Sequence, residues 1–409
     1  MNSKTVFCYL DDYHHGQIYL GSLFVQKTSG RETYSFEWSD EILSRKEHIM
    51  LDPKLHTDIS GRQYAENGIF GMFSDSCPDR WGRLLMKRRE SITARREGRK
   101  PHSLLESDYL LGVYDESRMG ALRFRTEPKG CFLAYDSELA IPPFTELRQL
   151  QEAARNFEAD TGSEETWLRL LMAPGSSLGG ARPKATVRDE QGQLWIAKFP
   201  SRSDTENIGA WEMVAHDLAD MCGLQVPEAR ALSINRDGTT FLVKRFDRIG
   251  KKRIHMASAM TMLEKTDNDH DASYLDIADW ITAHCQNASG DLKELWCRIV
   301  FSIAISNTDD HLRNHGFLLK KDGWHLSPLY DVNPNPYGSN LSLGITEADS
   351  ALDFSLALDC AELYQIKPKE AKTIIDNIKT IVADNWLMLA KKYKISRPAI
   401  ERVRPAFTS

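Results

Sequence analysis

The sequence lacks several features that define large classes of proteins. Its seven cysteines are odd in number and scattered, with no two closer than 12 positions, so it offers neither a disulfide framework nor the CxxC pairs of a zinc ribbon. No apolar run is long enough to cross a bilayer, and the longest lies around residues 299–305. The first residues, MNSKTVFCYLDD, turn acidic before the apolar core of a signal peptide is complete. We therefore expect a protein of the reducing cytoplasm without a membrane segment.

A large excess of positive charge is also missing. The chain has 52 lysines and arginines against 58 aspartates and glutamates, a formal net charge of -6, which excludes a protein that is basic throughout. Residues 80–100 are an exception, with nine basic and two acidic residues, and Asp75 or Ser76 is expected to cap this helix. Two interpretations stay open: a solvated helix face whose arginines cover apolar neighbours, or a contact with an acidic partner or with DNA held by that partner.

The apolar content is sufficient for folded cores. Hydrophobic residues make up 41% of the 409 residues, and this length predicts two or three packed units. We predict an α+β fold in which an N-terminal mixed α/β part with antiparallel strands is joined to a mostly helical C-terminal lobe. The predicted domains span residues 1–135, 136–255 and 256–409.

Local patterns place the elements along the chain. Short β-branched and aromatic runs separated by glycine-containing turns predict an antiparallel meander over residues 5–38. Apolar periodicity predicts a helix at 145–160 and, further on, strands at 185–188, 194–199, 228–235 and 240–246 around a helix at 209–222. The remaining predicted helices lie at 274–284, 292–306, about 350–360, 367–383 and 385–393, interrupted by a hairpin at 316–319 and 324–326.

The stretch from residue 306 to 335 is the most informative about chemistry. It places Asp309, then Asn314 five positions later, and Asp331 after the short hairpin. Phosphoryl transfer needs a carboxylate to orient the attacking hydroxyl and oxygen ligands to hold magnesium against the phosphates. This order is that of the catalytic loop and metal-binding aspartate of protein kinases, although NTDDH stands in place of HRD and YDVN in place of DFG.

Two other interpretations of this stretch are open. Its polar residues are also the kind that end a helix in a loop. His311 and His315 are four positions apart, as in some zinc sites, but Arg313 lies between them and no HExxH is present.

Lys198 and Glu212 form a second candidate pair. Lys198 interrupts the apolar strand LWIAKFP, and Glu212 follows 14 residues later in a helix. In a kinase such a lysine holds the α and β phosphates and such a glutamate pairs with it. Taken separately, each is also an ordinary surface charge.

Residues 175–184, GSSLGGARPK, form a glycine-rich loop before the strand at 185–188. The loop has neither the GKS/T ending of a Walker motif nor GxGxxG. Its amides are suited to wrapping a phosphate, with Arg182 or Lys184 adding charge, and a mobile surface turn is the alternative. Ser176 and Ser177 are candidate phosphorylation sites, because an added phosphate would compete with the bound anion.

Taken together, these segments resemble the HipA family of serine/threonine kinases, the toxins of bacterial toxin–antitoxin pairs. The resemblance covers nearly the whole chain, and it rests on motifs that occur in the family's order. These motifs are FSDSCPDRWGRLL (73–85), SSLGGARPKA (176–185), LWIAKFP (194–200), LVKRFDR (242–248), NTDDHLRNHGFLL (307–319) and LSPLYDVNP (326–334).

The resemblance implies a divergent, kinase-like two-lobed architecture, with residues 1–135 as the family's N-terminal subdomain and ATP bound between the lobes. It implies that Asp309 is the catalytic residue and that Asn314 and Asp331 hold Mg2+. Ser177 becomes the candidate autophosphorylation site, with Ser176 as the alternative. The implied ATP-binding residues are Lys198, Glu212, Ser177, Gly179, Gly180 and Lys184.

The resemblance further implies a partner, a HipB-like helix-turn-helix antitoxin, with DNA contacted only through that complex. It implies a cytoplasmic protein substrate, for which an aminoacyl-tRNA synthetase is the family's example. Our leading hypothesis is therefore an ATP- and Mg2+-dependent protein serine/threonine kinase that arrests growth. A small-molecule kinase and a catalytically silent co-repressor are the alternatives.

Overall fold

The computed structural model describes residues 2–46, 49–133, 141–159, 167, 170–171, 182–269 and 271–407. The chain divides into two compact units. The N-terminal unit comprises Met1–Arg202, Asp247–Ala257 and Leu319–Lys321, and the C-terminal unit comprises Ser203–Phe246, Ser258–Leu318 and Asp322–Ser409. The mixture of helices with antiparallel strands confirms the predicted α+β class. The three-domain division stays a prediction.

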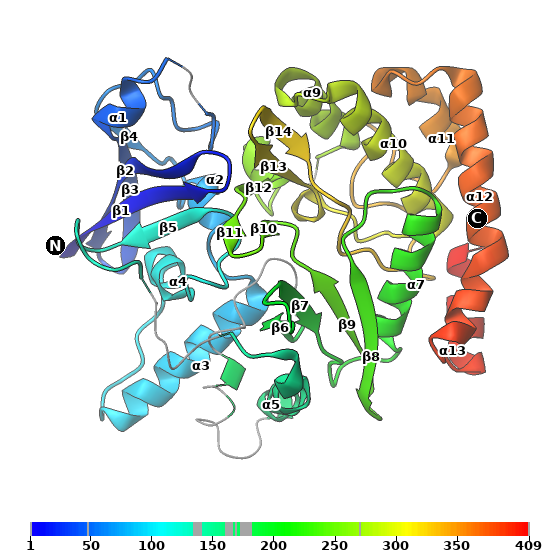
Figure 1. Ribbon diagram of the computed structural model, residues 1–409, viewed down its shortest axis with the longest axis horizontal. Coiled ribbons are helices and arrows are strands. Elements are labelled where there is room, and N and C mark those ends of the chain that lie inside the picture. The colour runs from blue at the N-terminus through cyan, green and yellow to red at the C-terminus, as the bar shows by residue number, and fades with distance from the viewer. Residues whose placement is uncertain are drawn as a thin grey trace. The chain divides into compact units, whose positions relative to one another are not determined.

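The N-terminal unit is built on a five-stranded antiparallel sheet, which confirms the predicted meander (Figure 1). Its strand order is β4-β3-β2-β1-β5. Phe36 on β3 and Phe124 on β5 each lie against Phe73, with ring centroids 5.6 and 6.0 Å apart, so the core forms where the 73–85 motif meets the sheet. The strands are β1 (Asn2–Asp12), β2 (Gly16–Thr28), β3 (Arg31–Trp38), β4 (Arg62–Tyr64) and β5 (Leu122–Arg125).

Helices and two further strand pairs complete the N-terminal unit. β6 and β7 pair antiparallel, as do the short strands β10 and β11. The helices are α1 (Asp40–Leu43), α2 (Gly71–Ser74), α3 (Arg80–Arg96), α4 (Glu106–Gly112) and α5 (Leu147–Ala159), which follows the 3-10 helix η2 (Phe144–Glu146). The strands are β6 (Lys184–Arg188), β7 (Leu194–Lys198), β10 (Arg248–Ile249) and β11 (Lys252–Arg253).

The cap of α3 differs from the sequence-based expectation. Neither Asp75 nor Ser76 begins this helix, because Asp75 ends α2 instead. Asp79 is the N-cap, and its Oδ1 accepts a 2.8 Å hydrogen bond from the Gly82 amide. The two polar residues before Pro78 are thus used by the preceding turn, and the basic helix begins later than predicted.

In the C-terminal unit, helix α7 (Ile208–Met221) packs on the antiparallel pair β8 (Ala229–Asn235) and β9 (Gly238–Lys244). Helix α12 (Pro368–Lys392) contacts α7 as well, so α7 is buried between a strand pair and a helix (Figure 1). A Cβ on Gly209 would lie 2.1 Å from the Thr239 carbonyl oxygen. Only glycine permits this close approach of α7 to β9.

The rest of the C-terminal unit is helical, as predicted, with one correction. The predicted helices at 367–383 and 385–393 are a single helix, α12, because the Asn385 side chain donates a 2.8 Å hydrogen bond to the Ile381 carbonyl within the helix instead of ending it. The other helices are α8 (Ala259–Met262), α9 (Tyr274–His284), α10 (Ala288–Ala304), η3 (Leu312–Asn314), α11 (Phe354–Asp359), η4 (Ala361–Tyr364), α13 (Arg397–Val403) and η5 (Arg404–Phe407).

Three further short strands occur among the described residues. Strand β14 (Gly323–Leu326) lies in the C-terminal unit, while β12 (Met256–Ser258) and β13 (Gly316–Lys320) contain residues of both units. The Ser327 amide donates a 2.8 Å hydrogen bond to the Gly316 carbonyl, which joins the ends of the predicted hairpin. Asp331 follows the end of β14 by five residues.

Candidate active site

The 306–314 loop follows the buried helix α10, and its internal bonds fix two predicted site residues. The Asn314 side-chain nitrogen Nδ2 donates a 3.0 Å hydrogen bond to the backbone carbonyl of Asp309. Asn314 itself lies in the 3-10 helix η3, so the five-residue spacing in sequence becomes a closed turn. The sequence spacing therefore places the two residues together through a local bond.

The two side chains differ in exposure. The Asp309 side chain is exposed, and it makes no hydrogen bond or ion pair with the described residues. Asn314 is only 3% exposed, and its Oδ1 is buried with no hydrogen-bond partner in the described part of the chain. A buried amide oxygen without a partner is costly and is a ligand type that Mg2+ accepts.

The segment around Asp331 is tied to the same loop on both sides. Before it, the Tyr330 hydroxyl donates to the Arg313 carbonyl at 2.8 Å. After it, the Asn333 amide donates to Asn307 Oδ1 at 3.2 Å. The structure thus brings the predicted metal-binding segment against the predicted catalytic loop within the C-terminal unit.

Asp331 has a left-handed backbone conformation, with φ of 61°. For a residue with a side chain this conformation is uncommon, and such conformations cluster at functional sites. The bonds of the neighbouring Tyr330 and Asn333 hold the chain in this conformation. The strain supports a functional role for this carboxylate.

The residue next to Asp309 is a buried support that sequence reasoning missed. Asp310 is 2% exposed, and its Oδ2 accepts a 2.6 Å hydrogen bond from the Tyr274 hydroxyl. Its Oδ1 lies 3.0 Å from Nε2 of His315. Asp310 therefore connects the first residue of α9 with the residue that follows Asn314.

Electrostatics keep this buried carboxyl ionised. Burial opposes ionisation, but His315 and the Tyr274 hydroxyl hold the pKa of Asp310 below its ordinary value. Burial and the adjacent Asp310 raise the pKa of Tyr274 well above 10, so its hydroxyl stays protonated and donates. A capping box of Ser273 and Asp276 fixes the start of α9, and this S-x-x-D pattern marks in the sequence the helix start that carries Tyr274.

The zinc alternative finds no ligand set in this part of the molecule. His315 is fully buried against Asp310 and Tyr274, while His311 is partly exposed. Across the ranges that the structure describes, no three His, Cys, Asp or Glu side chains gather into a group suited to a metal ion. Asn314 and Asp331 carry oxygen donors, the ligand type that Mg2+ prefers, and their role as Mg2+ ligands stays a prediction.

In the N-terminal unit, β6 and β7 place two predicted ATP-binding lysines opposite each other. Lys184 and Lys198 are cross-strand partners, and both are buried. Like charges directly opposite are destabilising, and Lys184 has a counter-ion in Asp79, whose Oδ2 lies 3.1 Å from its Nζ. Burial raises the pKa of Asp79 to about 6, against the opposing effect of Lys184.

The same contact explains part of the early PDRWG motif. Trp81 donates from Nε1 to the Lys184 carbonyl at 3.0 Å, and Trp81 is fully buried. Asp79 and Trp81 thus hold β6 through its first residue, one by charge and one by a hydrogen bond. This motif therefore has a structural role at the strand that follows the glycine-rich loop.

Glu212 lies on α7 in the C-terminal unit and is 3% exposed. The start of its helix is anchored by Asn207, which exchanges two hydrogen bonds with Thr239, of 3.0 and 2.9 Å. Lys198 belongs to the other unit, so the pairing of Lys198 with Glu212 stays a prediction. Ser176, Ser177, Gly179 and Gly180 lie outside the described residues, and their roles stay predictions as well.

Comparison with known proteins assigns the family. The family model described as the HipA-like C-terminal domain matches residues 176–386, more than half of the 409 residues. The chain belongs to the HipA-like family. Among the described helices, none combines the length and apolar character that a membrane crossing requires.

Two curated relatives and one solved structure illustrate the similarity. A Haemophilus influenzae protein named "Putative kinase" is 30% identical over 40% of this chain and 54% of its own length. A Sinorhizobium fredii protein named "Putative kinase Y4dM" is 26% identical over 47% of this chain and 50% of its own length. The chain thus spans about half the length of the curated relatives it matches.

The solved structure is HipA of Shewanella oneidensis, determined in a complex with HipB and operator DNA. It shares 16% sequence identity with this chain, covers 98% of this chain and 95% of its own, and gives a TM-score of 0.67. At this identity the comparison establishes that the two proteins share a fold.

Proposed function

We propose that this protein is an ATP- and Mg2+-dependent protein serine/threonine kinase. The observation that carries the proposal is the arrangement around the 306–314 loop. Asn314 is bonded to the Asp309 backbone with its Oδ1 buried and unpartnered, and the strained Asp331 is held against the same loop. Family membership and the names of the two curated relatives support the same activity.

In this proposal each side chain has a defined task. The exposed Asp309 carboxylate orients the attacking hydroxyl and accepts its proton. Asn314 Oδ1 and the Asp331 carboxylate would hold Mg2+, which when bound neutralises charge on the ATP phosphates. Lys198 contacts the phosphates and Glu212 orients Lys198. The remaining ATP-binding residues in the proposal are Ser177, Gly179, Gly180 and Lys184.

The biological part of the proposal follows from the family. We propose that the kinase arrests growth by phosphorylating a cytoplasmic protein, with an aminoacyl-tRNA synthetase as the first candidate. The Shewanella relative is found with HipB and operator DNA, so a HipB-like helix-turn-helix antitoxin is the proposed partner. DNA would be contacted through that partner.

The test is phosphate transfer from labelled ATP by purified full-length protein, in a lysate of cells that lack it. Asp309→Asn should lower the transfer rate at least 1,000-fold, because it removes the carboxylate that orients the hydroxyl. The matched control is Asp322→Asn, which changes an exposed aspartate in the turn of the neighbouring hairpin and should leave the rate within twofold.

Three results would contradict the proposal. Wild-type transfer rates in Asp309→Asn, with unchanged thermal unfolding, would remove the catalytic assignment. Label on a metabolite instead of a polypeptide would indicate a small-molecule kinase. Tight antitoxin binding by a wild-type protein that transfers no phosphate would indicate a catalytically silent co-repressor.

A further inference from the structure

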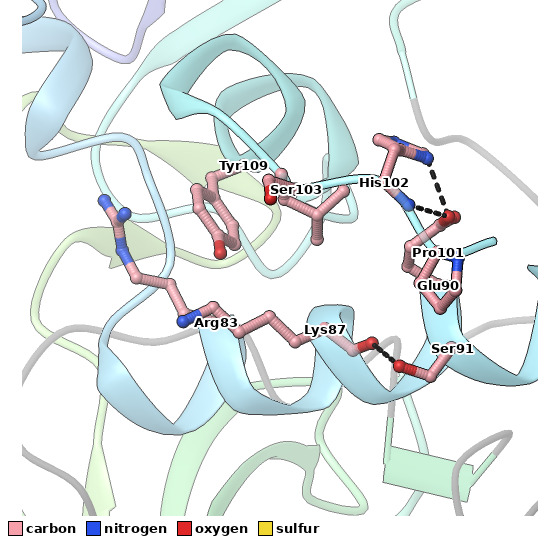
Figure 2. A pocket seen from close by; sticks show the side chains of 9 residues that line it. Arg83, Lys87, Glu90, Ser91, Pro101, His102, Ser103 and Tyr109 are labelled. Carbon is pink, nitrogen blue, oxygen red and sulfur yellow. Dashed lines mark hydrogen bonds and ion pairs between the residues drawn. The ribbon is translucent and has the colours of Figure 1, made fainter. Parts of the chain in front are cut away.

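A cavity of about 510 Å³ lies in the N-terminal unit, and none of its lining residues belongs to the proposed kinase centre (Figure 2). It is formed by one face of α3, the segment 101–104 and Tyr109 of α4. This volume is in the range of small-molecule sites. Its lining is rich in charged and hydroxyl groups, which suits a polar ligand.

One wall of the cavity is fixed by Arg83. Its guanidinium donates to both carboxylate oxygens of Glu106, at 2.6 and 2.7 Å. The same guanidinium carbon lies 4.4 Å from the centre of the Tyr109 ring. This bidentate ion pair and the stacking on Tyr109 hold Arg83 in one orientation. The carboxylate of Glu106 is therefore paired with Arg83.

The opposite wall is fixed by Glu90, as Figure 2 shows. Its carboxylate accepts a 3.0 Å hydrogen bond from the His102 amide and lies 2.6 Å from Nδ1 of His102. It also pairs with Arg99. The bonds from Arg99 and His102 lower the pKa of Glu90 to about 2. The one carboxylate in the lining is therefore already bound by Arg99 and His102.

Lys87 lies between these walls, one helical turn from Arg83 and one from Ser91 (Figure 2). Its side chain is exposed, and within the described ranges no carboxylate lies at ion-pair distance from its ammonium. Because Glu90 and Glu106 are bound elsewhere, no carboxylate of the described residues pairs with Lys87 in the cavity. A cation in a concave site with fixed walls attracts small anions.

We propose that this cavity binds a small organic phosphate, with the phosphate group against Lys87. A phosphate brings up to two negative charges and three acceptor oxygens, which match an ammonium with three donors. The cavity volume of about 510 Å³ is many times the roughly 30 Å³ that one water occupies. A phosphate fills only part of this volume, so a sugar attached to the phosphate fits beside His102 and Ser103. The site shares no residue with the proposed kinase centre. The phosphate-binding proposal can therefore be tested independently of the proposed kinase activity.

The experiment is calorimetric titration of the full-length protein with ribose 5-phosphate at fixed ionic strength, with ribose as the neutral probe. Wild-type protein should show saturable binding of ribose 5-phosphate and none of ribose. Lys87→Glu should weaken binding at least tenfold. The matched control is Lys100→Glu, which reverses an exposed charge of the same basic segment outside the cavity and should change the affinity less than twofold.

Hydrogen exchange locates the ligand. Ribose 5-phosphate should slow exchange in peptides that cover residues 83–109 of the wild type, and this protection should disappear in Lys87→Glu. Absence of saturable binding to the wild type would overturn the proposal. So would equal weakening by the two charge reversals, which would indicate general attraction to a basic surface, or binding of ribose as tight as that of its phosphate.

Discussion

The Tyr274 hydroxyl donates a 2.6 Å hydrogen bond to Asp310, and both side chains are buried. The two residues are 36 positions apart, yet this bond anchors the loop that carries Asp309 to the start of α9. Because Asp310 is ionised and shielded from water, the bond belongs to the stronger, charge-assisted class. It fixes the residue next to the exposed Asp309, whose backbone is also bonded to Asn314.

Tyr274→Phe should lower the free energy of unfolding by about 1–3 kcal/mol, because it leaves a buried carboxylate short of a donor. Urea unfolding of the full-length protein measures this change. Tyr364→Phe is the matched control: Tyr364 is also buried, and its hydroxyl has no hydrogen-bond partner in the described structure. Its removal should leave the free energy of unfolding unchanged or raise it, because a buried hydroxyl without a partner costs free energy in the folded state. Equal losses in the two variants would show that the Asp310 bond contributes nothing specific.

Asn314→Ala should raise the Mg2+ concentration needed for half-maximal phosphate transfer at least tenfold. The reason is that it removes the buried, unpartnered oxygen next to the catalytic loop. Magnesium titrations of the transfer rate measure this shift, and excess Mg2+ should restore part of the rate. Asn340→Ala, at an exposed asparagine, should shift the midpoint less than twofold. A rate that is reduced equally at every Mg2+ concentration would assign Asn314 to loop geometry only.

Stability should fall as the pH drops from about 6.5 to about 4 because of His255. Burial lowers the pKa of His255 to about 4, so in this window the unfolded chain binds a proton that the folded chain does not. The contribution is fully present above pH 6.5 and is lost as the pH falls through the window, on the order of 2–3 kcal/mol. Of the groups near this ring, Asp12 raises the pKa of His255 and His15 lowers it.

Urea unfolding between pH 4 and pH 7 tests this dependence. His255→Leu should flatten the loss of stability relative to the wild type. His56→Gln, at an exposed histidine, should leave the pH dependence unchanged. A wild-type slope that survives in His255→Leu would place its origin in other groups.

Incubation with ATP and Mg2+ should add one phosphate to the glycine-rich loop, at Ser177. Phosphopeptide mapping by mass spectrometry identifies the site. Ser177→Ala should abolish the modification, while Ser176→Ala should retain it. The reverse pattern would assign the site to Ser176, and loss of modification in Asp309→Asn would show that the protein modifies itself.

Local sequence was sufficient wherever the determining contacts are local. The meander, the helices at 274–284 and 209–222, and the hairpin before Asp331 follow from side-chain periodicity and turn residues. The five-residue spacing predicted Asp309 and Asn314 in one loop, and in the structure a single side-chain bond closes this separation. The resemblance to the family's motifs then indicated the chemistry, phosphoryl transfer, that this order of residues supports.

Only the tertiary structure decided the partners of buried charges. Nothing periodic in the sequence connects Asp79 with Lys184 or Tyr274 with Asp310, since strand register and helix packing determine which distant groups meet. At the exposed Lys87 as well, only the structure shows that Glu90 and Glu106 are bound to other residues. The sequence by itself determined most elements and the order of the candidate site residues, because periodicity and turns are local, and the packing determined which distant buried charges meet and neutralise each other.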